Sequence, residues 1–154
     1  MRSEVEEFLK ATLERYVEAE RAIHEGDAGP RLAMWSRQEP VTLFGAAFTK
    51  SGWTEVAPVF DFLASTFSDC SSYENEVVAV EASGDLAYMV ALEHSNVSIN
   101  GEPRAYTLRV TTVFRREDGE WKIVHRHGDS LASESPTAVV DALHAAARSP
   151  LAGR

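Results

Sequence analysis

Cysteine is nearly absent, because the 154-residue sequence contains only Cys70. A single cysteine cannot form an internal disulfide, so we expect a fold held by its hydrophobic core and a reducing, cytoplasmic location. The N-terminal stretch MRSEVEEFLKATLERYVEAE is too charged for a signal peptide, and no apolar run approaches the roughly 20 residues of a membrane span. We therefore expect no membrane partner.

Basic residues are scarce as well. The 15 lysines and arginines are outnumbered by 24 aspartates and glutamates, which gives a formal net charge of −9. This charge would repel a phosphate backbone, and the densest basic cluster, Arg115-Arg116, is followed at once by two acidic residues. Nucleic acid is therefore not an expected partner. The length fits one domain, predicted at residues 1–131, with a C-terminal helix or tail at residues 132–154.

The N-terminal segment has the pattern of an amphipathic helix. Ser3 and Glu6 match a capping box, and apolar residues from Val5 onward recur at helical spacing with charged residues between them. Gly26-Asp27 is expected to end this helix. A shorter helix is predicted at Pro30–Ser36, with the proline in its first turn.

A short strand and a third helix are predicted next. The strand covers Pro40–Gly45, and the helix lies within SGWTEVAPVFDFLASTF, where Ser51 is the candidate N-cap. Pro58 is expected to kink this helix or delay its start, because proline lacks the backbone N–H that a helix interior uses.

From about Tyr73 the hydrophobic period becomes that of strands. Four segments rich in β-branched and aromatic residues are separated by Gly84-Asp85, Asn100-Gly101 and Asp118-Gly119, which are typical of tight hairpin turns. These segments predict an antiparallel meander of four strands. Three helices followed by such a meander predict an α+β fold, in which a curved antiparallel sheet wraps around the helices and leaves a cone-shaped central pocket.

The order of these elements and the ending YTLRVTTVFRREDGEWKIVHRHGDS resemble the NTF2-like, or SnoaL-like, superfamily over about Ser3 to Leu131. The last hairpin is most similar to the calmodulin-dependent kinase association-domain-like group, with a basic-acidic-glycine turn before Trp-x-x-Val-His-x-His. The superfamily includes ketosteroid isomerase, polyketide cyclases and dehydratases. The resemblance therefore implies the fold, and a homodimer formed through the open face of the sheet, but no single reaction.

The segment WKIVHRHGD, residues 121–129, offers a candidate metal site. His125 and His127 lie on one side of a predicted strand and would be able to chelate an ion. With Asp129 they match the first part of a metallo-hydrolase motif, but Ser130 stands where that motif needs a histidine. We therefore expect neither a metal nor another cofactor, and histidines packed or hydrogen-bonded in a sheet are the alternative.

Resemblance to ketosteroid isomerase implies a carboxylate base, a tyrosine and a neutral carboxylic acid. Tyr16 lies on the first predicted helix, where that family carries its tyrosine. The position of the base reads Leu43-Phe44-Gly45 and that of the acid lies near Leu108 to Val110, so neither offers a carboxylate. The isomerase mechanism is not supported, and for Tyr16 the alternative is a core tyrosine with its hydroxyl bonded to a neighbour.

A histidine–aspartate pair is another candidate acid–base site, of the kind that the dehydratase relatives use. His127 and Asp129 share a predicted strand face about 7 Å apart, which we expect to be too far for direct contact without a bulge. His94, on the neighbouring strand, is a third candidate. Nucleophilic catalysis is not expected, because Cys70 lies in the polar stretch SDCSS with no signature around it.

The register of the last hairpin sorts its side chains onto two walls. Counting from the Asp118-Gly119 turn pairs Thr111 with Arg126, which places Arg109, Thr111 and Arg126 on one wall and the histidines on the other, more apolar wall. A bulge would break this register. The kinase association domains carry pocket arginines at positions matching Thr111 and Gly128, so the resemblance suggests that Arg109 and Arg126 hold an anion. Bonds to internal carboxylates such as Glu93 are the alternative.

Two functions follow from these patterns. The first is a small-molecule-binding protein or enzyme acting on a hydrophobic or anionic metabolite, with isomerase, cyclase or hydratase chemistry. The second is a non-catalytic association module that dimerises through its sheet face. Which wall faces the pocket stays open. The candidate ligand-binding residues are Tyr16, Trp35, Trp53, Arg109, Thr111 and Arg126.

Overall fold

The computed structural model describes residues 3–45 and 47–131. Its helices are α1 (Glu4–His24), α2 (Gly29–Met34) and α3 (Trp53–Thr66). The predicted cap of α1 is present, since the Glu6 amide donates to Ser3 Oγ at 3.1 Å. The segment predicted as a C-terminal helix or tail, residues 132–154, lies outside the described residues.

The start of α3 differs from the prediction. Gly52, with a φ of 93°, precedes the helix, whereas Ser51 pairs with Thr42 in a short hairpin that the sequence analysis missed. A serine held in a strand cannot turn back to cap the helix, and the Trp53 amide instead donates to Glu39 Oε2 at 2.9 Å. The helix continues through Pro58 to Thr66.

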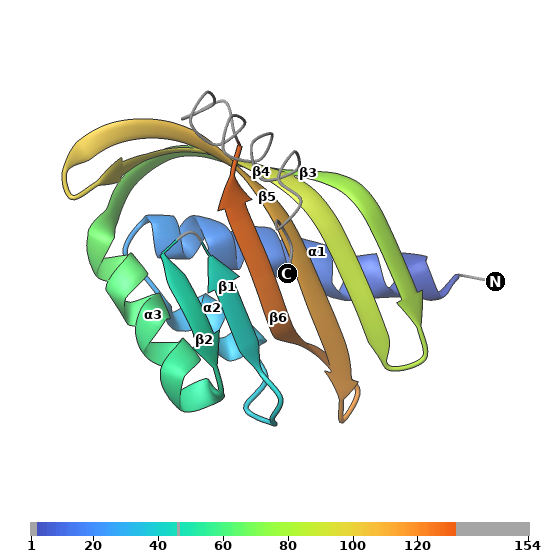
Figure 1. Cartoon of the computed structure of the whole chain (residues 1–154). Coiled ribbons are helices and arrows are strands. Elements are labelled where there is room, and N and C mark those ends of the chain that lie inside the picture. Colours follow the sequence, from blue (N-terminus) through green and yellow to red (C-terminus); the bar gives the residue numbers. More distant parts are fainter. Residues whose placement is uncertain (1–2, 46, 132–154) are drawn as a thin grey trace, which may run out of the picture.

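The strands form one curved sheet (Figure 1). They are β1 (Thr42–Gly45), β2 (Phe48–Ser51), β3 (Phe67–Ser83), β4 (Leu86–Ile99), β5 (Glu102–Glu117) and β6 (Glu120–Ser130), in the order β2-β1-β6-β5-β4-β3. The predicted antiparallel meander β3–β6 is confirmed. The short β1–β2 hairpin extends it, because β1 pairs in parallel with β6.

Two of the predicted turns have the geometry that their residues favour. Asn100 and Asp118 have φ angles of 51° and 50°, and the glycines that follow have 82° and 81°. Positive φ at both central residues is the requirement of the type I′ hairpin turn, which asparagine or aspartate followed by glycine meets at least cost. The turn residues therefore set where the long strands reverse.

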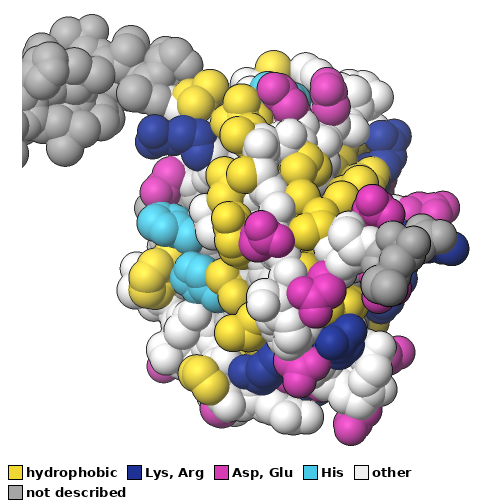
Figure 2. Space-filling model, turned by 90° about the vertical axis from the view of Figure 1, so that its right-hand side faces the viewer, with side chains coloured by type: hydrophobic (Ala, Val, Ile, Leu, Met, Phe, Trp, Pro, Cys, Tyr) yellow, Lys and Arg dark blue, Asp and Glu magenta, His cyan; other side chains and the backbone are white. Residues whose placement is uncertain are grey.

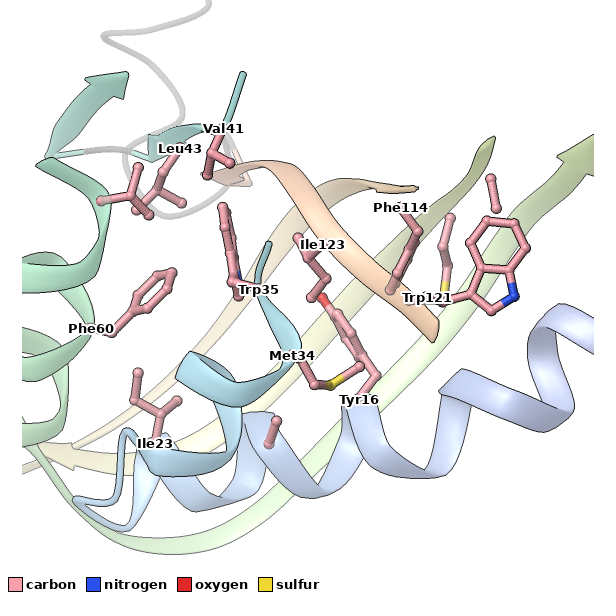
Figure 3. Close-up of a cluster of buried hydrophobic side chains, with 14 of the residues drawn as sticks. Tyr16, Ile23, Met34, Trp35, Val41, Leu43, Phe60, Phe114, Trp121 and Ile123 are labelled. Carbon is pink, nitrogen blue, oxygen red and sulfur yellow. The ribbon is translucent and has the colours of Figure 1, made fainter. Parts of the chain in front are cut away.

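The helices pack against one face of the sheet, and the hydrophobic core lies between them (Figure 3). The Phe8 ring from α1 meets the rings of Phe114 and Trp121 edge-on, at centroid distances of 4.9 and 5.1 Å. Trp35 packs against Phe60 of α3 at 5.0 Å. In the part of the chain that is described, no helix combines the length and apolar composition needed to cross a membrane.

The predicted register of the last hairpin is wrong beyond Phe114. Phe114 pairs with Ile123 as expected, but Val113 pairs with His125, so Val124 is an extra residue that forms a β-bulge. An extra residue reverses the alternation of side chains along the rest of the strand. Arg126 therefore pairs with Thr112 rather than Thr111, and it no longer shares a face with Arg109.

The sheet thus has two faces of different character. The inner face packs on the helices and carries, among others, Ala91, Glu93, Val110, Thr112, Ile123 and Arg126, all of them buried. The outer face carries their neighbours, among them Tyr88, Val90, Arg109, Thr111, His125 and His127. A view of one side of the molecule shows hydrophobic side chains gathered in a band, with histidines at its edge (Figure 2).

Candidate functional site

A cavity of about 750 Å³ opens between α3, the β1–β2 hairpin and the ends of β4, β5 and β6. Its wall is mostly apolar and includes Leu43, Phe48, Val59, Leu63 and Leu108. Polar groups come from the side chains of Tyr106 and of three buried residues, His24, Arg31 and Arg126. A mostly apolar cavity with a few polar groups is the usual form of a small-molecule site.

The polar groups at the buried end belong to one hydrogen-bonded set, the polar network, formed by Tyr16, Glu20, Arg31, Glu93 and Arg126. Arg126 donates to both carboxylate oxygens of Glu93, at 3.0 Å each, and lies 3.4 Å from Glu20 Oε1. Arg31 donates to both oxygens of Glu20, at 3.0 and 2.5 Å. Two arginines and two glutamates therefore neutralise one another inside the domain.

Electrostatics keeps Glu20 and Arg126 charged despite their burial. Burial opposes ionisation of Glu20, but the charges of Arg31 and Arg126 outweigh it and lower the pKa of Glu20 to about 2. Burial alone would lower the pKa of Arg126, but the neighbouring Glu93 and Glu20 raise it well above its ordinary value. Because two arginines pair with two glutamates, the network leaves no formal net charge for a ligand.

Tyr16 extends from α1 into the interior of the domain (Figure 3), where it joins the network. Its hydroxyl donates to Glu93 Oε2 at 2.6 Å and accepts from Arg126 Nη1 at 2.6 Å. Burial raises the pKa of Tyr16 well above its ordinary value, so the phenol stays protonated. This is the arrangement of a tyrosine with its hydroxyl bonded to neighbours, and Tyr16 itself does not line the cavity.

A second polar pair, His24 and Tyr106, was missed by the sequence analysis. His24 Nδ1 lies 2.5 Å from the main-chain oxygen of Glu20, and its Nε2 lies 2.6 Å from the Tyr106 hydroxyl. The signal was present in the sequence, because Tyr16, Glu20 and His24 follow one another at four-residue spacing and so share one face of α1.

The other predicted ligand-binding residues lie away from this cavity. Trp35 is in the core beside Phe60, and Trp53 is half-buried beneath the guanidinium of Arg37, at 4.5 Å from its ring centroid. Arg109 and Thr111 are on the outer face. The structure thus brings Tyr16 and Arg126 into contact, which neither the resemblance nor the predicted register had suggested. Both lie on the inner side of the sheet, whereas Arg109 is on the outer face.

The histidines singled out in the sequence lie on the outer face. His127 Nε2 contacts Asp129 Oδ2 at 2.8 Å, which corrects our expectation that the two are too far apart. The 7 Å estimate describes backbone positions, and both side chains are long enough to lean together along the strand. His125 bonds to Thr42 Oγ1 at 2.7 Å, and His94 to Glu76 at 2.9 Å. Among the described residues, no three His, Cys, Asp or Glu side chains form a group that could hold a metal ion.

A curved sheet wrapped over helices, with an apolar cavity between them, defines the NTF2-like class of α+β domains. A family profile for the SnoaL-like domain matches residues 9–133, and the chain belongs to this family. Comparison with curated protein sequences gives no match.

Solved structures agree on the fold. An NTF2-like superfamily protein from Salmonella enterica is 19% identical with a TM-score of 0.67, over 80% of this chain and 88% of that one. A candidate dehydratase of the NTF2-like family from Streptomyces avermitilis is 18% identical with a TM-score of 0.63, over 81% and 96%. A candidate calcium/calmodulin-dependent kinase association domain from Thiobacillus denitrificans is 21% identical with a TM-score of 0.57, over 79% and 90%.

Proposed function

We propose that this SnoaL-like domain binds a mainly hydrophobic small molecule in its cavity and acts on it by isomerase, cyclase or hydratase chemistry. The observation that carries the proposal is the cavity of about 750 Å³, with apolar walls and a buried polar end. Its relatives include a candidate dehydratase and a candidate ketosteroid isomerase, which fits this kind of chemistry. A cytoplasmic location is part of the same proposal.

Of the two ligand types expected from the sequence, the polar network favours the hydrophobic one. Arg31 and Arg126 line the cavity, but each is already paired with a buried carboxylate, Glu20 or Glu93. An anionic ligand would have to compete with these carboxylates, whereas a neutral ligand would leave them paired. We therefore assign the arginines to the architecture of the cavity rather than to anion binding.

A matched pair of probes tests this proposal. We expect 2-naphthalenemethanol to bind about tenfold or more tightly than 2-naphthoate, which has the same rings and a negative charge. Displacement of the neutral dye Nile red measures both affinities. Tighter binding of the naphthoate would contradict the assignment of the arginines, and failure of both probes and of the dye to bind would contradict the cavity as a ligand site.

A substitution at Gly128 locates the site. A Cβ added there would make ordinary contacts with Val110 and Leu108, at 3.5 and 3.7 Å, so Gly128→Leu should fold and extend its side chain into the cavity that Gly128 lines. We expect this variant to bind the dye at least about tenfold more weakly. Thr111→Leu places the same leucine side chain on the outer face and should bind as the wild type does. Equal binding by both variants would place the ligand elsewhere.

The second candidate function, an association module, is favoured by the outer face. Val78, Leu86 and Tyr88 are 63%, 56% and 42% exposed there, which leaves an apolar surface that the described helices do not cover. We propose that a second copy of the chain covers it. Sedimentation across a range of concentrations should then give a dimer that Tyr88→Lys disrupts and Phe62→Lys, on α3, does not. A dimer that binds no probe would favour this function over the first.

A further inference from the structure

The pair formed by His24 and Tyr106 has a defined proton arrangement. His24 Nδ1 lies 2.5 Å from a main-chain carbonyl oxygen, which only accepts, so this nitrogen carries the hydrogen. In the neutral ring Nε2 is then a free acceptor, and the Tyr106 hydroxyl, 2.6 Å away, donates to it. A base and an acid therefore stand side by side in the cavity wall, which both residues line.

The surroundings hold the ring in place and maintain these protonation states. The His24 ring stacks on Phe67 at a centroid distance of 4.6 Å and is tied to α1 through Nδ1. Burial lowers the pKa of His24, so the imidazole is neutral at pH 7. Burial also raises the pKa of Tyr106 to about 12, although the Ser95 hydroxyl partly opposes this, so the phenol remains a donor.

The polar network does not need this pair. Glu20 and Glu93 satisfy the two arginines, and Tyr16 completes that set. The His24–Tyr106 bond joins the network only through the main chain of Glu20. A phenolic hydrogen can rotate from one acceptor to another. If a ligand oxygen approached Tyr106, the hydroxyl would be able to turn toward it and release the lone pair of His24 Nε2.

We propose that His24 and Tyr106 are the catalytic pair of this site, acting on a neutral, mainly apolar substrate that carries a carbonyl group; this inference rests on the proposed function. His24 Nε2 takes a proton from the carbon next to the carbonyl, and the C–H electron pair forms a C=C bond. The carbonyl π electrons move to oxygen, where Tyr106 donates a hydrogen bond. The substrate must therefore also carry a C=C bond next to the carbon that loses the proton. The proton then returns from Nε2 to the far carbon of that C=C bond, the electrons on oxygen re-form the carbonyl, and the C=C bond ends up beside the carbonyl, which completes an isomerisation with no other reactant.

The ring opening of 5-nitrobenzisoxazole, a small neutral probe, also requires a base and a hydrogen-bond donor to oxygen. When a base removes the hydrogen on carbon 3 of 5-nitrobenzisoxazole, the C–H pair forms a nitrile and the N–O bond breaks. The electrons of the N–O bond pass to a phenolate oxygen, and the coloured product is measured by absorbance. We expect the full-length protein to accelerate this ring opening, with His24 as the base and Tyr106 as the donor to the phenolate oxygen.

Variants assign the roles. We expect His24→Gln to lower kcat/KM for the probe at least about 100-fold, the lower end of the usual contribution of a general base. Tyr106→Phe should lower it about tenfold, through loss of one hydrogen bond to the developing charge. His94→Gln, a matched histidine outside the cavity, should have no effect. Binding of Nile red to each variant shows whether its cavity is intact.

The pH profile gives a second readout that needs no variant. We expect kcat/KM of the wild type to rise with pH through a pKa below the ordinary value of 6.5, because only neutral His24 is a base. The titratable and charged groups that surround His24 are Glu20 on α1, Arg31 on α2, Tyr73 on β3, Tyr106 on β5 and Arg126 on β6.

The outcomes separate the two proposals. Absence of both dye binding and turnover would overturn the proposed function and, with it, the pair. Dye binding without turnover would overturn the pair alone. The catalytic pair would also be overturned if His24→Gln turned over the probe as fast as the wild type. The same holds if kcat/KM of the wild type did not rise with pH through a pKa below 6.5.

Discussion

Two side-chain pairs that involve β6 have similar contact distances but very different surroundings. On the inner face Arg126 contacts Glu93 at 3.0 Å, and on the outer face His127 contacts Asp129 at 2.8 Å. The inner side chains are 9% and 2% exposed, whereas the outer ones are each 48% exposed. The comparison teaches that burial, rather than distance, decides how strongly each pair constrains the domain, since water replaces a lost partner only on the outer face.

The largest effect should come from breaking the inner pair. We expect Arg126→Met to lower the free energy of unfolding by about 3–5 kcal/mol, because it leaves the buried Glu93 carboxyl without its arginine partner and Glu20 with Arg31 alone. Urea denaturation measures this loss. Arg109→Met, an exposed arginine of the outer face, is the matched control and should change stability by no more than about 0.5 kcal/mol. Equal effects of the two variants would contradict the contrast between the faces.

Acid should weaken the inner face through Glu20. The pKa of Glu20 in the folded chain, about 2, lies below its ordinary value of 4.5, so this stabilisation is complete above pH 4.5 and is lost as pH falls toward 2. The loss should be about 3 kcal/mol. Urea midpoints from pH 7 to pH 2 measure it, and Glu20→Gln should show a shallower decline over that range. An unchanged slope would mean that other carboxylates dominate.

Removal of one hydroxyl from the polar network should have an intermediate effect. We expect Tyr16→Phe to cost about 1–3 kcal/mol, because Glu93 loses a donor and Arg126 an acceptor in a buried site. Tyr88→Phe makes the same change on the outer face, where Tyr88 is 42% exposed, and should be close to neutral. Thermal or urea unfolding of both variants distinguishes them, and a neutral Tyr16→Phe would show that the hydroxyl is dispensable.

The smallest effect should come from the outer pair. Asp129→Asn should lower stability by no more than about 1 kcal/mol, because both side chains of this pair are half-exposed to water. Salt should reduce the difference between variant and wild type further, because exposed charges are screened. Unfolding in low and high salt checks both statements, and a loss as large as that of Arg126→Met would refute the comparison.

Sequence patterns were sufficient for most of the fold. The turns at Asn100-Gly101 and Asp118-Gly119 need positive φ angles, which few other residue pairs adopt easily, so they located the hairpins well. Helical periodicity placed α1 within one or two residues. Strand β1 was predicted within Pro40–Gly45, but β2 and its hairpin with β1 were missed, because β2 is only four residues long and carries little periodic signal.

The site was much less predictable. Strand alternation is a reliable guide only while pairing is regular, and the bulge at Val124 reversed it for every residue that follows. No local feature of WKIVHRHGD marks this bulge, since Val124 is as good a strand residue as Ile123. His24 was missed for a different reason, because a polar residue on a helix is usually exposed, whereas here Tyr106 and the Glu20 carbonyl satisfy its ring.

The bulge also bears on how the two faces of this domain can change. In a regular strand, exchanging the chemistry of the two faces requires many coordinated substitutions. In β6 one added or removed residue near Val124 would move Arg126 to the outer face and bring the histidines inward, while the turn and the first part of the hairpin stay the same. A change of length by one residue is thus a short mutational route between cavities with different chemistry.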